Sequence, residues 1–573
     1  MPRANDAVEA ALLEYAELLS ILSEDRFKPR AYEKAARAVG GYPEDLTGMD
    51  LAAILKIPSV GASIGEKVDE FLQTGTMASL EELRGQISPG VREMTRIPGL
   101  GPKKALVLYR DLGIDGVEEL RRAVEEGRLA DLKGFGARTE ENIRRGLDRL
   151  SQSTDRVLIS VAADLAEVFV ERLGQRPEVR RIEVAGSLRR MVETIGDVDL
   201  LVASADPAQT MDAFVSAGTV ERVLAKGETK SSVLVRAGLQ VDLRVVPEPA
   251  WGAALIYFTG SKPHNIRIRE MAVRKGLKLN EYGLFEAASG ELIVASTEEE
   301  VYGRLGLPWI PPTLREDRGE VEAALDGTLP DVLTRSQIRG DLHTHTKLTD
   351  GLATLDQMLE VAARLRYAYY AVTDHAPNLF MQRMTDEKML AQREQVRDLQ
   401  TRYPKMTLLH GSELNIDAEG NVDWDAEFLD GFDICVASVH SHFGQSKDEM
   451  TRRIVRAMEN PNVHVIGHPT ARLINKREPI EFDHEAVFQA AARTGTALEI
   501  NGYPDRLDLR DEHILWARRH GVKFAVDTDS HATLHLEHMR YGVATAQRGW
   551  LTKDDVINAW PLGKLRRFLR KGR

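Results

Sequence analysis

The chain is poor in cysteine and contains no long apolar run. Among its 573 residues Cys435 is the single cysteine, so no internal disulfide can form. No apolar stretch approaches the roughly 18 residues of a membrane span. Glu9 and Glu14 interrupt the first segment, where a signal peptide needs a continuous apolar core. These absences argue against a membrane protein or a disulfide-stabilised secreted protein, and they predict a reducing, cytoplasmic setting.

The chain also lacks an excess of positive charge. It carries 88 acidic and 76 basic residues, for a net charge of -12. This balance argues against a protein that simply coats nucleic acid. A catalytic protein that holds metal ions through carboxylates can still be acidic, but it would then need a local basic track to bind DNA. Length and composition predict a globular protein of roughly three to five domains.

Histidine is almost absent from the first three-fifths of the chain. Of fifteen histidines only His264 precedes His343, and the remaining thirteen follow it. The simplest interpretation is two regions with two different chemistries. The stretch 308–339, rich in proline and charge, is the predicted connection between them.

The first 150 residues are predicted to be helical, with three glycine-centred turns at 57–62, 97–102 and 132–137. Each turn precedes a helical run, so its backbone N–H groups could hold a phosphate without reading a base. The pattern resembles the helix-hairpin-helix motif; the alternative is a plain helical bundle with glycine caps. The candidate DNA-binding residues here are Gly61, Gly99, Gly101, Lys103, Lys104, Gly134 and Gly136.

Two aspartates alternate along a predicted apolar strand in the middle of the chain. Asp197 and Asp199 are two residues apart, so their side chains share one face. Like charges on one face repel, and burying them is costly. Asp242 lies in a second β-branched run. Three strand carboxylates could converge on two divalent cations about 4 Å apart, which can hold a triphosphate and activate an attacking hydroxyl.

A tight corner upstream of these aspartates adds phosphate-binding groups. Gly186 and Ser187 could offer a backbone N–H and a hydroxyl, and Arg189 and Arg190 supply positive charge. A Gly-Ser corner, an Asp-x-Asp strand and a third strand aspartate together resemble the nucleotidyltransferase fold.

The segments 257–269, YFTGSKPHNIRIR, and 280–283, NEYG, closely resemble the X family of DNA polymerases, such as polymerase beta. The resemblance implies a turn packed against the deoxyribose, and hence a preference for deoxynucleotides. It implies that Asp197, Asp199 and Asp242 bind two Mg²⁺ or Mn²⁺ ions, with Asp242 nearest the primer 3′-hydroxyl. The implied nucleotide-binding residues are Gly186, Ser187, Arg190, Tyr257, Phe258, Gly260, Lys262 and Asn265, with Arg269 on the template. Lys262 departs from the vertebrate pattern; it could contact phosphate or base, or be solvated.

The resemblance extends to the amino-terminal region, where 27–36 and 57–75 are similar to the family's lyase domain. It implies that Lys67 forms a Schiff base with a sugar aldehyde, and that Lys28 and Tyr32 lie at a 5′-phosphate pocket. Taken alone, Lys67 would be read as a solvated surface lysine. Ser63 stands where the family often has a second lysine, which predicts weak or absent lyase activity.

From residue 341 onward, short apolar strands that end in His, Glu or Asp alternate with helices. This pattern predicts a (β/α) barrel with its active site at the carboxyl ends of the strands. Such side chains suit zinc, manganese or iron. The constellation resembles the PHP (polymerase and histidinol phosphatase) domain, a trinuclear metal phosphoesterase. The ligands that it implies are His343, His345, Asp350, His375, Glu413, His440, His468, Asp529 and His531, and Arg472 is a candidate phosphate contact.

Together these observations predict a multidomain α+β and α/β protein. The expected parts are a helical lyase-like helix-hairpin-helix domain (1–78), a second helical helix-hairpin-helix subdomain (79–150), a nucleotidyltransferase palm with a mixed sheet (151–246), a nascent-base-pair or thumb subdomain (247–315), a linker (316–338) and a PHP barrel (339–573). We expect a DNA-directed DNA polymerase that fills short gaps in base-excision repair. Its barrel would be a 3′-5′ exonuclease, and could also act as an abasic-site endonuclease or 3′-phosphatase.

Two alternatives belong to other classes: a PHP phosphoesterase whose polymerase-like half only binds DNA, and a non-catalytic repair scaffold. The expected partners are gapped or primed DNA and deoxynucleoside triphosphates, with no membrane, and contacts to other repair proteins are open. We expect a monomer in the bacterial cytoplasm, associated with the nucleoid.

Overall fold

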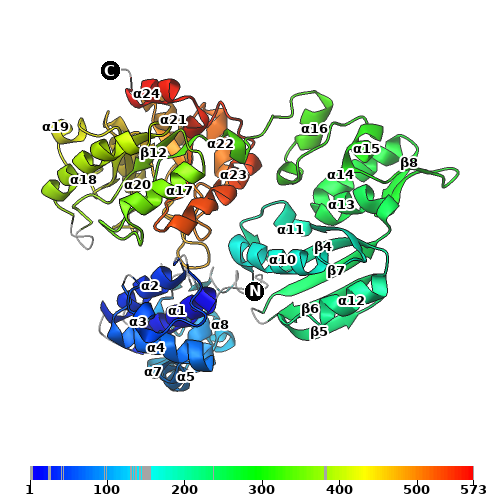
Figure 1. Ribbon diagram of the computed structural model, residues 1–573, viewed down its shortest axis with the longest axis horizontal. Coiled ribbons are helices and arrows are strands. Elements are labelled where there is room, and N and C mark those ends of the chain that lie inside the picture. Colours follow the sequence, from blue (N-terminus) through cyan, green and yellow to red (C-terminus); the bar gives the residue numbers. More distant parts are fainter. Residues whose placement is uncertain are drawn as a thin grey trace.

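The computed structural model describes residues 4–22, 27–40, 42, 44–57, 59–95, 97, 100–129, 132, 135, 139–140, 143–144, 147, 156–235, 238–379 and 384–571. Figure 1 shows a cluster of amino-terminal helices, a mixed sheet with helices, and a carboxy-terminal barrel. The predicted multidomain fold class is confirmed. Across this described part of the chain, no helix has both the length and the apolar character needed to cross a bilayer.

Short helices make up the amino-terminal region. They are α1 (Ala4–Leu22), α2 (Phe27–Gly40), α3 (Leu51–Ile54), α4 (Ala62–Thr74), α5 (Ala78–Gln86), α6 (Pro89–Thr95), α7 (Pro102–Leu112) and α8 (Val117–Glu125). Their apolar faces share one core, in which the rings of Tyr15 on α1 and Tyr32 on α2 lie 4.5 Å apart. Gly61 and Gly101 precede α4 and α7 in extended conformation, so these helices begin where the glycine turns predict.

The palm is a five-stranded sheet with helices on one face. Its elements are β1 (Val157–Leu158), α10 (Ile159–Gly174), β2 (Val179–Val184), α11 (Gly186–Arg189), β3 (Thr194–Ile195), β4 (Asp197–Ser204), α12 (Pro207–Val215), β5 (Val220–Lys226), β6 (Lys230–Val235) and β7 (Gln240–Val246). The strand order is β2-β4-β7-β6-β5, with β4 and β7 parallel and the other pairs antiparallel. Phe169 of α10 and Phe214 of α12 meet in the apolar core beneath the sheet.

A smaller α/β unit follows the palm. It contains α13 (Trp251–Thr259), α14 (Lys262–Arg274), β8 (Leu277–Asn280), β9 (Gly283–Glu286), β10 (Leu292–Val294) and α15 (Glu298–Arg304). The stretch 316–338, predicted as a linker, includes α16 (Glu320–Leu325). Val321 and Ala324 of α16 are buried in the same core as Ile268 and Tyr302 of this unit, so the connection is packed where α16 lies.

The carboxy-terminal domain is a parallel β/α barrel. Its elements are β11 (Gly340–Asp341), α17 (Leu355–Arg364), β12 (Tyr369–Val372), α18 (Asp386–Leu399), β13 (Thr407–Asn415), α19 (Ala426–Leu429), β14 (Ile434–Ser438), α20 (Lys447–Glu459), β15 (Val465–Ile466), α21 (His484–Thr494), β16 (Ala497–Asn501), α22 (Asp511–Arg519), β17 (Phe524–Asp527), α23 (Met539–Arg548) and α24 (Leu562–Leu569). The strands run β11 to β17 in chain order. A parallel bridge between Thr344 and Ser530 brings the two edges together, which nearly closes the barrel.

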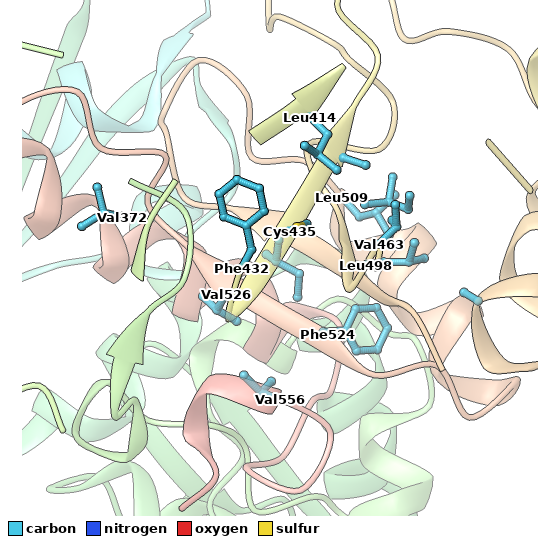
Figure 2. Close-up of a cluster of buried hydrophobic side chains, with 14 of the residues drawn as sticks. Val372, Leu414, Phe432, Cys435, Val463, Leu498, Leu509, Phe524, Val526 and Val556 are labelled. Carbon is cyan, nitrogen blue, oxygen red and sulfur yellow. The ribbon is translucent and has the colours of Figure 1, made fainter. Parts of the chain in front are cut away.

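Apolar side chains fill the layer between these strands and their helices. Figure 2 shows Cys435 within this cluster, with Phe432 and Val463 among its members. Cys435 is fully buried, so it acts as a small apolar residue of the core. The packed layer holds the strands in place and thereby fixes the positions of the side chains at their carboxyl ends.

Charged and apolar contacts join the barrel to the palm. Arg472 Nη2 lies 2.7 Å from Glu193 Oε2, and Arg540 Nη1 lies 2.8 Å from Glu167 Oε1. The barrel domain also contributes Ile474, Leu507 and Tyr541 to the apolar core of the palm. The palm and the barrel therefore pack directly against one another.

Candidate active sites

Three palm carboxylates lie together because of how two strands pair. β4 and β7 are parallel, and their register places Asp199 opposite Asp242. Asp197 is two residues before Asp199 and shares its face. Burial, followed by the nearby charges of Asp197 and Asp242, raises the pKa of Asp199 to about 7. Gathered carboxylates that repel one another in this way are suited to bind divalent cations.

Asp242 has the opposite electrostatic balance. Burial opposes its ionisation, but hydrogen bonds from Lys230, Ser232 and Gln240 outweigh that cost and lower the carboxyl pKa. Lys230 Nζ lies 2.5 Å from Oδ2, and Gln240 Nε2 donates to Oδ1 over 2.8 Å. Lys230 was missed by the sequence interpretation, because nothing in the local pattern of β6 says that this strand pairs with β7.

The predicted Gly-Ser corner lies directly against this cluster. Gly186 has a φ of +61°, and a Cβ atom there would lie 2.2 Å from Asp199 Oδ2. Only glycine fits this close approach without displacing the carboxylate. The corner opens the short helix α11, which carries Ser187. The structure thus brings Gly186, Ser187 and the carboxylates together.

Arg190 lies at the junction of the palm, the following unit and the barrel. Its Nη1 donates to the backbone carbonyl of Thr259 over 2.6 Å, and its Nε lies 3.0 Å from Glu316 Oε1. Arg548 of the barrel donates to the backbone carbonyl of Arg190 and pairs with Glu316 over 2.8 Å. A Cβ atom at Gly260 would lie 3.2 Å from Arg190 Nη1. The structure therefore places the predicted triphosphate-binding arginine beside the predicted sugar-binding turn, already paired with a carboxylate.

The rest of the predicted nucleotide pocket lies on α13 and α14. Tyr257 and Lys262 are exposed, and Phe258 is half-buried. Asn265 is buried, and its Nδ2 donates to the carbonyl of Tyr257 over 2.7 Å. Arg269 Nε donates to the carbonyl of Asn265 over 3.1 Å, which fixes part of its side chain on α14.

Two of the predicted lyase residues, Tyr32 and Lys67, lie at the ring of Tyr15. Tyr15 packs against Tyr32, and Lys67 Nζ lies 5.8 Å above the Tyr15 ring. Lys67 Nζ also donates to the carbonyl of Ser63 over 3.2 Å. Lys28 is exposed on the same helix as Tyr32.

The second predicted DNA-binding turn is described only in part. Gly101 caps α7, and among the described residues no atom beyond the chain neighbours lies within 4 Å of the position that a Cβ would take there or at Gly61. Lys104 Nζ lies 5.8 Å above the ring of Phe135. The predicted contacts Gly99, Gly134 and Gly136 and the side chain of Lys103 lie outside the described residues.

Glu413 is the centre of the histidine-rich site at the mouth of the barrel. Its Oε2 lies 2.9 Å from His375 Nδ1, and its Oε1 lies 3.1 Å from His440 Nε2 and 3.0 Å from His468 Nε2. Glu413 lies two residues before the end of β13, and each histidine follows a different strand. The barrel therefore gathers these side chains at one end.

Two further carboxylates complete the cluster. Asp529 Oδ1 lies 3.2 Å from His345 Nε2, while Asp350 lies 3.3 Å from His375 and 3.4 Å from His531. Within the described part of the chain, three groups have ligand atoms within 4.8 Å of one another: His345, Asp350, His375 and His531; His343, His345 and Asp529; His375, Glu413 and His440. Every predicted ligand except His468 falls in one of these groups, and His468 joins them through Glu413.

The donor set fits bound metal ions. Burial opposes charge on Glu413, but the neighbouring imidazoles of His440, His375 and His343 outweigh burial and hold its pKa well below the usual value. Burial likewise opposes charge on His375, but Asp350 and Glu413 raise its pKa well above the usual value. His345 Nδ1 is buried and has no hydrogen-bond partner among the described residues. Metal cations can replace these protons and use such unpaired ring nitrogens.

Glu499 supports this cluster and has no counterpart in the predicted site. Its Oε1 lies 2.6 Å from His343 Nδ1, which orients the ring so that Nε2 faces the other ligands. The backbone N–H of His468 donates to the other oxygen of Glu499. The signal was visible, because Glu499 is the lone carboxylate in an apolar strand run, Ala497–Asn501, in the same part of the chain as the assigned ligands.

Arg472, the candidate phosphate contact, lines the same cavity as the cluster, and its guanidinium is held by other groups. Its Nη2 is bound to Glu193 and to the carbonyl of Leu507, over 2.7 and 2.5 Å. Arg506 lies beside the site, with its Nε 3.5 Å from Asp529 Oδ2. Arg506 is therefore a second basic side chain close to the predicted metal ligands.

Known proteins resemble this chain over nearly its whole length. Family models match the chain over 3–77 (helix-hairpin-helix domain), 91–149 (SAM-like helix-hairpin-helix tandem), 254–316 (DNA polymerase beta thumb) and 341–502 (PHP domain). The chain is 34% identical over 559 residues to the DNA polymerase/3'-5' exonuclease PolX of Bacillus subtilis (strain 168), covering 97% of each chain.

The chain belongs to the family X DNA polymerases that carry a PHP domain.

Two other relatives each resemble one part of this PolX-type chain. DNA polymerase lambda of Rattus norvegicus is 26% identical over 339 residues, which cover 53% of this chain and 56% of the relative. A probable phosphatase of Thermoanaerobacter sp. (strain X514) is 30% identical over 243 residues, which cover 40% of this chain and 94% of the phosphatase. The predicted family resemblance is confirmed.

Proposed function

We propose that this PolX-type chain is a DNA-directed DNA polymerase that fills short gaps by two-metal nucleotidyl transfer. The observation that carries the proposal is the register of β4 and β7, which holds Asp197, Asp199 and Asp242 on one face beside the Gly186–Ser187 corner. These carboxylates would hold two Mg²⁺ or Mn²⁺ ions, which supply Lewis-acid stabilisation of the developing charge. Family membership and the name of the B. subtilis relative support the same activity.

The remaining palm residues would position the nucleotide. The hydroxyl of Ser187 and the guanidinium of Arg190 are suited to bind the triphosphate, and the turn ending at Gly260 is suited to pack against the deoxyribose. Asn265 would contact the base edge and Arg269 the template strand. Asp242, held in its ionised form by Lys230, would act nearest the primer 3′-hydroxyl.

We propose that the barrel removes nucleotides from DNA 3′ ends as a metal-dependent 3′-5′ exonuclease. Its three carboxylates and six histidines would hold a three-metal cluster of zinc, manganese or iron, which supplies an activated hydroxide for attack on a phosphoester. Abasic-site cleavage and removal of a 3′-phosphate are compatible with the same donor set. Glu499 would keep His343 correctly oriented.

We further propose that gapped or primed DNA and deoxynucleoside triphosphates are the partners, that the chain acts as a monomer, and that it works at the bacterial nucleoid. The helix-hairpin-helix regions would grip DNA phosphates through the backbone N–H groups after Gly61 and Gly101.

One experiment tests both activities together. The chain is incubated with one-nucleotide-gapped DNA, with and without nucleotides, and the primer length is read. We expect extension by one nucleotide when nucleotides are present and shortening when they are absent. A chain that shortens the primer but never extends it would support the alternative of a phosphoesterase with a DNA-binding half.

The raised pKa of Asp199 predicts that cation binding in the palm depends on pH. The Asp199 carboxyl has a usual pKa of 3.8 and a pKa of about 7 in the folded chain. At a pH between these two values, the folded chain holds a proton on Asp199 that the unfolded chain has lost. This contribution to stability therefore falls as pH rises across that window, and a cation must displace the proton. We expect the Mn²⁺ affinity of the palm to rise about tenfold per pH unit below pH 7 and then level off.

Calorimetric Mn²⁺ titrations at several pH values measure this dependence. The barrel also binds metal, so the palm component is obtained as the difference between the chain and its Asp199→Asn variant. If the difference in Mn²⁺ affinity between the chain and Asp199→Asn did not change between pH 3.8 and about 7, the raised pKa of Asp199 would be contradicted.

The position of Lys67 predicts a slow Schiff-base reaction. Its ammonium is partly exposed beside Tyr15 and hydrogen bonds to Ser63, and no second lysine stands at position 63. We expect weak borohydride trapping on a 5′-deoxyribose-phosphate end, and none with Lys67→Arg. The Lys56→Arg variant is the control, because Lys56 is an exposed lysine just before the first turn. Trapping that survives in Lys67→Arg would remove Lys67 from the proposed site.

A further inference from the structure

The metal-ligand cluster of the barrel opens into a cavity of about 4270 Å³. Besides ligands such as Glu413 and Asp529, its lining includes Tyr503, His535 and His538. None of these three residues belongs to the ligand set or to the groups that support it. We refer to them together as the ring cluster.

The ring cluster is built from two segments of the chain. Tyr503 follows β16, whereas His535 and His538 lie in the short 3-10 helix Thr533–His538. The two imidazole rings are stacked, with centroids 5.1 Å apart and planes at 13°. The Tyr503 ring stands nearly perpendicular to both, with centroids 5.1 and 5.0 Å away. The result is a compact aromatic wall in the cavity.

Hydrogen bonds tie this wall to the metal ligands. The N–H of Tyr503 donates to Asn501 Oδ1 over 2.9 Å, and Asn501 Nδ2 donates to Asp529 Oδ2 over 3.0 Å. On the other segment, the N–H of His531 donates to His535 Nδ1 over 3.3 Å. Each half of the ring cluster is therefore connected to a predicted metal ligand by one or two hydrogen bonds. A base that stacks on the ring cluster would have its neighbouring phosphate close to the metal ligands.

A cation for that phosphate lies on the same turn as Tyr503. The N–H of Arg506 donates to the carbonyl of Tyr503 over 2.8 Å, and its guanidinium lies 3.5 Å from Asp529. Arg506 Nη1 is buried and has no hydrogen-bond partner among the described residues. Arg477 lines the same cavity, whereas Arg472, Lys476, Arg510 and Arg540 of the lining are paired with carboxylates. An aromatic wall beside guanidinium groups is the combination that binds single-stranded nucleic acid.

We propose that the ring cluster is a stacking subsite for an unpaired nucleobase at the 3′ end of DNA, with Arg506 on the adjoining phosphate. The proposal rests on the exonuclease function proposed above and names its substrate class. A paired terminal base remains stacked on its duplex, and unpairing it has a cost, so the barrel would prefer frayed, mismatched or single-stranded ends. Stacking accepts any base, because every base has a π face.

The test compares two single-stranded substrates that differ only in the terminal base. One ends in a normal nucleotide, and the other ends in the same sugar-phosphate without a base. Stacking on one aromatic residue contributes roughly 1–3 kcal/mol per base, which corresponds to about 5- to 150-fold in affinity. We expect Tyr503→Ala and the bulkier Tyr503→Leu to raise KM by a factor in this range on the normal end and to leave KM on the baseless end unchanged. Tyr503→Phe keeps the ring and should retain the preference.

A binding measurement separates this inference from the proposed function. A 3′-terminal 2-aminopurine, joined by a phosphorothioate linkage that resists cleavage, is titrated with the full chain. We expect the fluorescence to be quenched by the chain and by Tyr503→Phe, but not by Tyr503→Leu. If the chain quenched the 2-aminopurine fluorescence but did not cleave ordinary DNA 3′ ends, the exonuclease would be refuted and the subsite would be supported. The subsite would be overturned if the Tyr503 variants raised KM equally on both substrates, or if Tyr503→Leu quenched the fluorescence as strongly as the unaltered chain. Cleavage of ordinary ends by the unaltered chain would still uphold the exonuclease in that case.

Discussion

Asp242→Ala is expected to abolish nucleotide addition while leaving 3′ shortening intact. The substitution removes a carboxylate of the palm cluster whose pKa is lowered and which Lys230, Ser232 and Gln240 hold in its charged form. Without it the two-metal site loses several kcal/mol of transition-state stabilisation, so extension should slow by about 1000-fold or more. The measurement is primer extension on one-nucleotide-gapped DNA, read together with shortening of the same labelled strand.

Two companion variants keep this result interpretable. Asp242→Asn preserves the size of the side chain, so it separates loss of charge from loss of packing, and it should be nearly as inactive. Asp212→Asn replaces an exposed palm aspartate on α12, away from the cluster, and should extend primers normally. Extension that persists in Asp242→Asn at the normal rate would end the two-metal assignment.

The second large effect is expected at Glu413, which contacts three histidines of the barrel. Glu413→Gln keeps the shape of the side chain but removes the charge that holds His375, His440 and His468 around it. We expect 3′ shortening to fall by about 100- to 1000-fold, because an altered ligand weakens metal binding and misplaces the attacking group. Elemental analysis should find less transition metal per chain, and gap filling should be unchanged.

His343→Ala should give the same separation of activities, since this imidazole lies between the ligands and Glu499. The matched control is His442→Ala, which removes an exposed histidine two residues from His440. If Glu413→Gln kept both its metal content and its shortening activity, the barrel cluster would not be the nuclease site. A chain that never holds transition metal would instead favour the scaffold alternative.

The location of the barrel site could be predicted from the sequence, whereas its set of nine ligands came from the resemblance to the PHP domain. Its strands follow one another around the barrel in chain order, so every strand end faces the same mouth. A histidine or carboxylate at a strand end therefore reveals its location by its place in the sequence. This reasoning does not single out Glu499, which lies in the middle of its strand and was left without a role. It could not distinguish Arg472 from Arg506, because both lie in loops whose direction depends on contacts with distant residues such as Glu193 and Asp529.

The palm was harder, because its strand order differs from its chain order. Alternation along β4 predicts from local geometry that Asp197 and Asp199 share a face. The pairing of β4 with β7, which brings Asp242 opposite Asp199, skips two intervening strands. A resemblance to a known family suggested this convergence, whereas the local pattern did not. Lys230 entered the site through the same non-local pairing.

The sequence by itself determined which strands carry the candidate site residues. The alternation of side chains along a strand and the position of a strand's end depend only on neighbouring residues. Only the tertiary structure decided which carboxylate meets which cation. It paired Arg190 with Glu316 and Arg548, packed α16 into the predicted linker, and placed Tyr503 against His535 and His538. The physical reason is that such contacts join segments far apart in the chain, and the packing of whole elements fixes them.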